Sequence, residues 1–307
     1  MGTFFSDLLV NVVLTTPLIG AYTMFALGIV FIYRASKVLN LAHGAMAMFP
    51  AYIAYSLTGL VGVVPAVIAA LAFGGGLGFG IERTVVRRLR QSSPTAQTVG
   101  TAGVLGLLIA LAVRFWGTSP LQAPSLFPKK SWSVGNSVLT LTDIGLFAFA
   151  LVLAGVFLAL FKYTDLGLAM RCAADNRRAA WLMGIDPDKT TAAAWVFAGV
   201  LAAFGGVLLS ASTILHPFTL SLQVLPAFVA ALLGGLESVP GAVGGSFIAG
   251  LAFGLVPFLD SLDLPLIDRF VSQTGTDKVA LGFVAFFVMS MRGRKFSVAD
   301  SSPSSAL

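Results

Sequence analysis

The chain has 307 residues, of which 57% are hydrophobic and only 10% are charged. Soluble domains carry about a quarter of charged residues, so this composition excludes an ordinary water-soluble enzyme and predicts an integral membrane protein. The formal net charge is +6, but the basic residues flank apolar runs, where signals of membrane orientation belong, and no nucleic-acid partner is needed to explain them.

The apolar runs, at roughly 17 to 25 residues, are long enough to cross a bilayer as helices. They leave no stretch for a separate globular domain. We expect an all-α integral membrane protein, a polytopic bundle of about eight or nine transmembrane helices, with one transmembrane domain over residues 1–295 and a disordered Ser-rich tail over 296–307. The candidate spans are 6–32, 38–58, 61–81, 97–116, 141–161, 190–211, 222–235, 240–259 and 276–291.

The second candidate span begins with the polar motif Asn40-Leu41-Ala42-His43-Gly44. Polar side chains in an apolar span are costly unless they face protein or a watered path, so Asn40 and His43 are candidate functional residues. Gly44 can break the helix and expose backbone groups to a solute, as in discontinuous transport helices. The alternative, in which Asn40 and His43 only bond to neighbouring helices, stays equally open.

Glycines crowd the third span at 74–80 and the eighth at 241–254. Glycine at four-residue spacing lets helix backbones approach closely in lipid, so these stretches predict helix-packing faces. The seventh span is short and is interrupted by Leu225-Pro226 and Gly234-Gly235. It is expected to be a half-span or a strongly bent helix.

The segment 163–189, between the fifth and sixth spans, has the pattern of short amphipathic helices. Thr164 or Asp165 can cap a helix start, and Gly184 supplies a left-handed stop. Asp186 and Pro187 then begin the next helix as cap and first residue. The residues Leu168, Cys172, Ala179 and Leu182 fall near one face, and Arg171, Asp175 and Arg178 on another.

Amphipathic helices of this kind need a partner surface. One possibility is another protein, which Asp175 and Asn176 among the arginines mildly favour. The other is the inner leaflet of the membrane, with the arginines near anionic lipid. The residues alone leave both open.

The distribution of basic residues predicts the orientation. Lys and Arg near span ends are retained on the cytoplasmic side. If nine spans alternate, fourteen of the nineteen basic residues fall on one side, which places the N-terminus outside and the C-terminus in the cytoplasm. These residues are Arg34, Lys37, Arg83, Arg87, Arg88, Arg90, Lys162, Arg171, Arg177, Arg178, Lys189, Arg292, Arg294 and Lys295.

The sequence shows no motif for catalysis. It lacks GxxxxGK[ST], HExxH and GxSxG, and it has only two histidines and one cysteine. We therefore expect no catalytic residues, no metal site and no cofactor. If transport by this chain uses ATP, a separate subunit hydrolyses it.

Four stretches together resemble the branched-chain amino-acid permease family of ABC importers, in order and in spacing, and the resemblance runs nearly end to end. The first contains the Asn40 to Gly44 motif, the second the run of arginines after the third span, the third the 163–189 segment and the fourth the seventh span. They are 33–52, 82–90, 167–185 and 227–242.

The resemblance implies a type II importer-like permease with a broken second helix, in the inner or plasma membrane of a bacterium. It implies a second related permease as heterodimer partner, two cytoplasmic ATPases, an extracytoplasmic solute-binding protein and surrounding lipid, with branched-chain or other hydrophobic amino acids, or a similar small polar solute, as cargo. The implied substrate-path residues are Asn40, His43, Gly44 and Phe228, and the implied ATPase-coupling residues are Gly167, Arg171, Asp175, Asn176, Arg178 and Gly184.

The chain departs from the family pattern at three places: Ala45 stands where an acidic or polar residue is common, Pro50 replaces a small residue, and 87–90 lacks a proline. These changes bear on the substrate more than on the mechanism. The rival function is a secondary transporter or channel for solutes such as urea or amides, working without ATPases. Coupling to protons or sodium would favour buried carboxylates, and no Asp or Glu lies centrally in a candidate span.

Overall fold

The computed structural model describes residue 12 and residues 15–254, apart from 124–126, 129 and 135–136. The ninth candidate span, the tail 296–307 and the last basic cluster at 292–295 lie outside the described residues. The described part is almost wholly helical, with one short β-hairpin.

Within the described residues, seven helical segments are long and apolar enough to cross a bilayer, and α12 is a shorter apolar helix. This confirms the polytopic helical bundle expected from the sequence. The helices are α2 (Thr16–Ser36), α3 (His43–Val61), α4 (Val63–Ile81), the π-helix η1 (Glu82–Val86), α5 (Pro94–Trp116), α6 (Leu141–Tyr163), α7 (Asp165–Asp175), α8 (Arg177–Leu182), α9 (Pro187–Ser212), α10 (Pro217–Leu222), α11 (Val224–Gly234) and α12 (Val239–Gly254).

Local capping signals set several helix starts. Ser93 accepts a hydrogen bond from the backbone N–H of Ala96, and Pro94 follows it at the first helical position of α5. Thr140 and Asp143 form a reciprocal capping box at the start of α6. At α9, Asp186 caps the helix and Pro187 is its first residue, as the sequence predicts.

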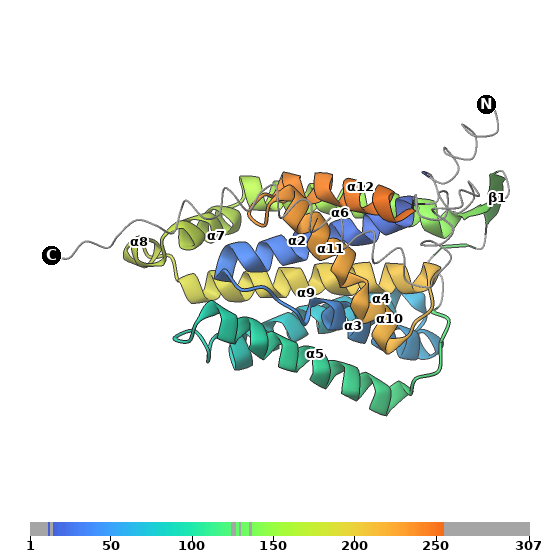
Figure 1. Cartoon of the computed structure of the whole chain (residues 1–307), viewed down its shortest axis with the longest axis horizontal. Coiled ribbons are helices and arrows are strands. Elements are labelled where there is room, and N and C mark those ends of the chain that lie inside the picture. The colour runs from blue at the N-terminus through green and yellow to red at the C-terminus, as the bar shows by residue number, and fades with distance from the viewer. Residues whose placement is uncertain (1–11, 13–14, 124–126, 129, 135–136, 255–307) are drawn as a thin grey trace, which may run out of the picture.

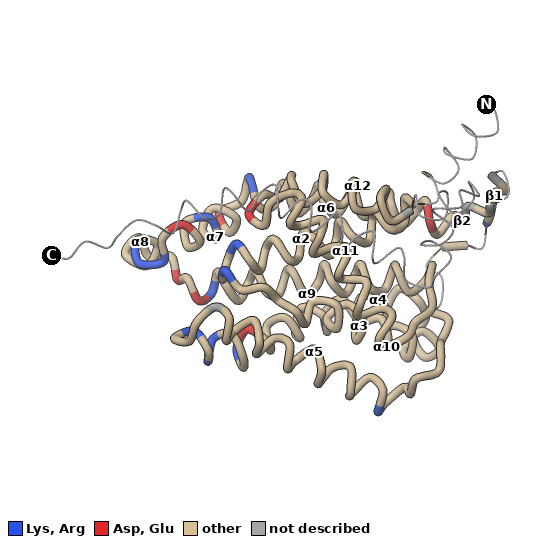
Figure 2. Tube along the Cα trace, viewed as in Figure 1, with Lys and Arg blue, Asp and Glu red and all other residues tan. Residues whose placement is uncertain are grey.

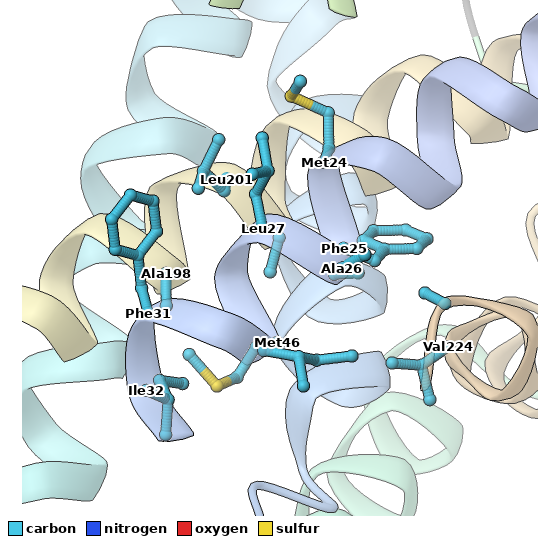
Figure 3. Packing of buried hydrophobic residues seen from close by; sticks show 14 of the residues in the cluster. Met24, Phe25, Ala26, Leu27, Phe31, Ile32, Met46, Ala198, Leu201 and Val224 are labelled. Carbon is cyan, nitrogen blue, oxygen red and sulfur yellow. The ribbon is translucent and has the colours of Figure 1, made fainter. Parts of the chain in front are cut away.

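The centre of the bundle is formed by α2 and α9, which are the most buried of the long helices. Figure 1 shows the two helices side by side, with α6 and α12 on one side and α5 on the opposite side. In the core, Leu27 and Phe31 of α2 lie near Ala198 and Leu201 of α9, while Val224 of α11 lies on the other side of α2 (Figure 3).

The glycine-rich stretches are packing faces, as predicted. A Cβ atom at Gly74 would lie 2.7 Å from the carbonyl oxygen of Gly199, and one at Gly78 would overlap the carbonyl of Trp195. The backbones of α4 and α9 therefore touch at these positions. Gly241 of α12 meets Gly234 of α11 in the same way, so the absence of side chains allows both helix pairs to approach closely.

The seventh span consists of α10 and α11. α11 ends at the expected Gly234-Gly235 pair, where Gly235 has φ 86°, but the break within the span lies at Gln223 and not at Pro226. α10 and α11 are separated at Gln223, whereas Pro226 lies within the first turn of α11, where a proline disturbs no helical hydrogen bond. His216 caps α10 through its ring Nδ1. The hydroxyl of Tyr22 on α2 donates to Oε1 of Gln223 at 3.4 Å, so a polar contact from the central helix reaches the break.

The two ends of the bundle differ in charge. Most Lys and Arg gather at the end where α7 and α8 lie (Figure 2). At the opposite end, β1 (Ser131–Val134) pairs antiparallel with β2 (Ser137–Thr140), with Ser131 opposite Thr140 (Figure 1). This asymmetry matches the pattern read from the sequence for the described basic clusters.

Candidate functional site

The chain is not helical between α2 and α3. α2 ends at Ser36, Lys37 adopts a left-handed conformation (φ 57°), and α3 begins only at His43. Figure 1 shows this 37–42 segment running from the charged end of α2 into the bundle, where α3 starts. Val38, Asn40 and Ala42 are almost fully buried. Non-helical backbone at membrane depth is tolerated only where protein or a watered cavity satisfies its polar groups.

Thr101 of α5 bonds to part of this non-helical backbone. Its hydroxyl accepts a hydrogen bond from the backbone N–H of Leu41 at 3.0 Å, and it lies 3.4 Å from the carbonyl oxygen of Leu39. The side-chain oxygen of Asn40 accepts from the N–H of Ala42 at 3.0 Å. Sequence reasoning missed Thr101, because a threonine in an apolar span shows nothing of a partner 60 residues away.

His43 is completely buried at the first position of α3. Its ring packs edge-on against Phe25 with centroids 6.2 Å apart, and it fills the space left by the missing side chain of Gly28. The ring nitrogens of His43 make no hydrogen bond of ordinary geometry within the described residues, although the ring lies against the backbone of Phe25 in α2. The alternative in which His43 bonds to a neighbouring helix therefore stays open, whereas Asn40 bonds locally and donates to Sδ of Met46 at 3.1 Å.

Gly44 is the second residue of α3 and does not break the helix, which is a correction to the expected role. A Cβ at this position would overlap the carbonyl oxygen of Ser221 in α10 and would lie 3.0 Å from a methyl of Val224 in α11. The interruption lies before His43, in the 37–42 segment. Gly44 instead brings the start of α3 against the break between α10 and α11, and Phe228 is half-buried one turn further along α11.

The 163–189 segment forms two short helices; Thr164 and Gly184 are the predicted cap and stop, and Asn176 is an additional cap that sequence reasoning missed. Thr164 accepts from the N–H of Gly167 at the start of α7, and Asn176 accepts from two N–H groups at the start of α8. Gly184 adopts φ 80°, and the N–H of Ile185 reaches back to the carbonyl of Ala180 at 2.9 Å. This is the left-handed stop predicted for the helix end.

Arg171 extends to the end of the preceding helix, α6. Its guanidinium donates to the carbonyl oxygen of Phe161 at 2.5 Å and lies 5.5 Å from the centroid of that ring. These contacts satisfy the last carbonyls of α6, as basic side chains do at helix ends. Gly167 faces the same carbonyl, because a Cβ there would overlap it. Arg171 and Gly167 thus fix the corner between α6 and α7.

The outer surface of this segment is apolar and partly charged. Trp181, Leu182 and Met183 are 70%, 75% and 65% exposed. Leu168 and Leu182, two residues of the apolar face expected to need a partner surface, are both exposed. The positions buried within the chain are Gly167, Met170, Ala173 and Ala180. Asp175 and Arg178 are exposed beside this apolar group.

A network of ion pairs links the segment to the start of α9 and the end of α4. Glu82, fully buried in η1, lies 3.2 Å from Nε of Arg87 and 3.5 Å from Nη2 of Arg90. Arg90 continues to Asp188 at 2.5 Å, and Asp188 pairs with Arg177 at 2.7 Å. Partial burial, and next the nearby charge of Arg90, lower the pKa of Arg177. Sequence reasoning missed the roles of Glu82 and Asp188.

The chain was compared with known proteins. The family described as "Branched-chain amino acid transport system / permease component" matches residues 11–293. The chain belongs to this permease family. No solved structure shows a significant match.

Relatives of this permease carry the same description. The high-affinity branched-chain amino acid transport system permease protein LivH of Escherichia coli K12 is 29% identical over 248 residues, which cover 75% of this chain and 80% of the relative. BraD of Pseudomonas aeruginosa is 30% identical with the same coverage. The probable LivH of Methanocaldococcus jannaschii is 29% identical over 76% of each chain. Family and helices together identify a multi-pass membrane permease, and its relatives are transport subunits.

Proposed function

We propose that this permease is the pore-forming subunit of an ATP-driven importer for branched-chain or other hydrophobic amino acids, or a similar small polar solute. It works with a second related permease, two cytoplasmic ATPases and an extracytoplasmic binding protein. The observation that carries the proposal is the exposed apolar surface on α7 and α8, at the charged end of the bundle. The family membership supports the amino-acid cargo.

The 163–189 segment has the properties of a protein-docking surface. Figure 1 shows α8 at the end of the bundle, beyond the ends of α2 and α6. Trp181, Leu182 and Met183 are therefore exposed apolar side chains outside the apolar span regions, and an apolar cluster rimmed by charges marks an interaction site. A helix lying on lipid would be expected within the membrane interface. Asp175 and Arg178 supply charges of both signs for a protein partner.

The charge distribution supports a cytoplasmic position for this end. Basic residues concentrate at the end that carries α7 and α8 (Figure 2), and positive residues are retained in the cytoplasm. ATP is hydrolysed in the cytoplasm, so the proposed docking surface and the ATPases lie on the same side of the membrane. The N-terminus then lies outside and the C-terminus inside.

Contacts at Phe161 connect the proposed docking surface rigidly to two membrane helices, so a displacement of this surface would move them. Arg171 ties α7 to the last carbonyls of α6, and Arg34 of α2 lies 4.8 Å from the centroid of the same Phe161 ring. A force applied to α7 by an ATPase is thus carried into two membrane helices. Rigid-body transmission of this kind is a common basis of switching.

The solute path lies near the start of α3. Asn40, His43, Gly44 and Phe228 remain our proposed path residues. Gly44 lies against Ser221 of α10, whereas the ring of His43 faces Phe25 and Gly28 of α2. His43 is fully buried against Phe25 and Gly28 of α2, so contact of its ring with a solute requires α2 and α3 to separate at this point.

The docking proposal is tested by purifying the tagged permease from its native membranes. Two chains that carry GxxxxGK[ST] and hydrolyse ATP should co-purify in equal amount with a second permease. The double variant W181S/L182S should lose the ATPases and keep the second permease. Retention of the ATPases by this variant would contradict docking through α8.

Transport is tested in proteoliposomes with the complete complex, ATP inside and a binding protein loaded with leucine, isoleucine or valine outside. ATP-dependent uptake supports the importer. Melting shifts of the binding protein over a panel of amino acids, urea, amides and small carboxylates would identify the cargo. Uptake by the permease alone, unaffected by removing ATP, would support the rival secondary transporter or channel.

A further inference from the structure

We infer that Glu82 is a positioning residue for coupling. Its buried carboxylate, through Arg90 and Asp188, holds the 163–189 segment to the inner ends of α4 and α5. The inference rests on the proposed importer function for its mechanism, while its geometry stands on contacts within this chain alone.

The network joins elements that are far apart in sequence. Oε1 of Glu82 lies 3.5 Å from Nη2 of Arg90, and Nη1 of the same guanidinium lies 2.5 Å from Oδ1 of Asp188. Arg90 therefore lies between two carboxylates: it donates a hydrogen bond to Asp188 and forms an ion pair with Glu82 that is not a hydrogen bond.

The bridge continues to α8 and α2. Arg177, at the first position of α8, pairs with Asp188 and also donates to the hydroxyl of Thr191 at 3.3 Å. The same hydroxyl lies 3.5 Å from the carbonyl oxygen of Ala35 near the end of α2. One connected set of polar contacts thus runs from η1 to α9, α8 and α2.

Burial makes this set sensitive to loss of one member. Glu82 is 0% exposed, and among the described residues its Oε2 has no hydrogen-bond partner. Glu82 pairs with two cations, Arg87 at 3.2 Å and Arg90 at 3.5 Å. Replacing Glu82 therefore removes the anionic partner of both guanidinium groups at a buried position, whereas an exposed pair contributes little. Glu82 also begins the π-helix, a rare geometry that is frequent at functional sites. Burying the carboxylate of Glu82 costs free energy, and a residue that served only to fill space would not need a charge.

The network offers a second route, besides the corner at Phe161, by which a displacement of the 163–189 segment can reach the membrane helices. The corner at Phe161 carries movement of α7 into α6 and α2, whereas the network carries movement of α8 through Arg90 into the turn between η1 and α5. α5 provides Thr101, which holds the 37–42 segment. Displacement of α8 by an ATPase can therefore reach the start of α3 from the opposite side of the bundle.

The geometric part is tested in the purified chain without partners. In a Cys172→Ser background, spin labels at Arg178→Cys on α8 and Gln91→Cys beyond η1 report the distance between the two sides of the network. A narrow distance distribution is expected with Glu82 present, and a broader one in Glu82→Gln and Arg90→Gln. Equal widths in all three would overturn the inference.

The control is Lys189→Gln, which removes the same charge as Arg90→Gln from a neighbouring ion pair. Lys189 has an 86% exposed side chain and, within the described residues, forms an ion pair only with nearby Asp186 at 3.6 Å. It should leave the distance distribution narrow. Broadening by Lys189→Gln equal to that by Arg90→Gln would show a general effect of charge and would also overturn the inference.

The coupling part is tested in the complete complex in proteoliposomes, with a leucine-loaded binding protein. Glu82→Gln and Arg90→Gln should raise the ATP consumed per leucine imported roughly 2- to 30-fold, the range expected when residues along a coupling route are changed. Simple loss of folded protein would lower both rates together and leave this ratio unchanged, which would count against a positioning role. If wild-type complex fails to import, the proposed function fails, and the spin-label distances still decide the geometry.

Discussion

Gly28 of α2 and His43 of α3 share one packing space. A Cβ atom built on Gly28 would lie 2.5 Å from Cε1 and 2.8 Å from Nε2 of His43. The ring is also covered by Phe25 and is fully buried. The position of the histidine therefore depends on the glycine facing it, and any side chain at position 28 has to displace the ring.

We predict that Gly28→Ala lowers the stability of the permease by about 1–3 kcal/mol, the usual cost of overpacking a dense core. Gly103→Ala is the matched control, because a Cβ there meets nothing within 4 Å, and it should change stability by less than about 0.5 kcal/mol. Thermal unfolding in detergent measures both. Equal melting temperatures for the two variants would show that the ring moves aside freely.

Arg171 and Arg178 are predicted to behave differently, although both were expected to couple to the ATPases. Arg171→Ala should cost about 1–3 kcal/mol, because it leaves carbonyls at the end of α6 without their charged donor. Arg178→Glu should leave the melting temperature nearly unchanged and weaken co-purification of the ATPases, since this side chain is exposed. The reverse pattern, a stable Arg171 variant and an unstable Arg178 variant, would contradict the assigned contacts.

Thr101→Val should destabilise the permease by about 1 kcal/mol, because the N–H of Leu41 then loses its acceptor at a part-buried position. Thr58→Val is the control, since its hydroxyl bonds only to a carbonyl one turn earlier in its own helix. Hydrogen exchange at Leu41 should quicken in the first variant and not in the second. Unchanged exchange at Leu41 would mean that another group satisfies this N–H.

A pH dependence is expected at the start of α9. The backbone N–H groups of Asp188 and Lys189 hold the pKa of Asp186 below its ordinary value of 3.8. The unfolded chain binds this proton more readily than the folded chain, so the carboxylate adds stability above the ordinary pKa and loses it as pH falls through the lowered one.

Melting temperatures of wild type and Asp186→Asn, measured from pH 7 down to about pH 3, test this expectation. Wild type should melt higher at neutral pH, and the difference should shrink in the acid range. A difference that stays constant with pH would mean that the charge of Asp186 contributes nothing.

The spans and their caps were largely predictable from the sequence because their signals are local. The expected span 141–161 corresponds to Leu141–Tyr163, and 97–116 corresponds to Pro94–Trp116. Hydrophobic length and cap signals such as Thr164 and Gly184 act within a few residues. The same holds for the glycine faces of α4 and α12, since close approach needs only small residues at helical spacing.

The details of the candidate site were less predictable because they depend on distant partners. The late start of α3 relies on Thr101, the break in the seventh span falls at Gln223 and not at Pro226, and Arg171 bonds a carbonyl of the preceding helix. Nothing near Glu82 in sequence marks its burial. These features follow from which helices become neighbours, and periodicity does not specify that.

The 37–42 segment also constrains the order in which the protein is made. Its backbone N–H at Leu41 is satisfied by a hydroxyl of α5, which leaves the ribosome about 60 residues later. A newly synthesised chain that has delivered only α2 and α3 to the bilayer would hold this polar backbone without its acceptor, which is costly in hydrocarbon. We therefore expect the 37–42 segment to reach its final conformation only after α5 has inserted and Thr101 can accept from Leu41.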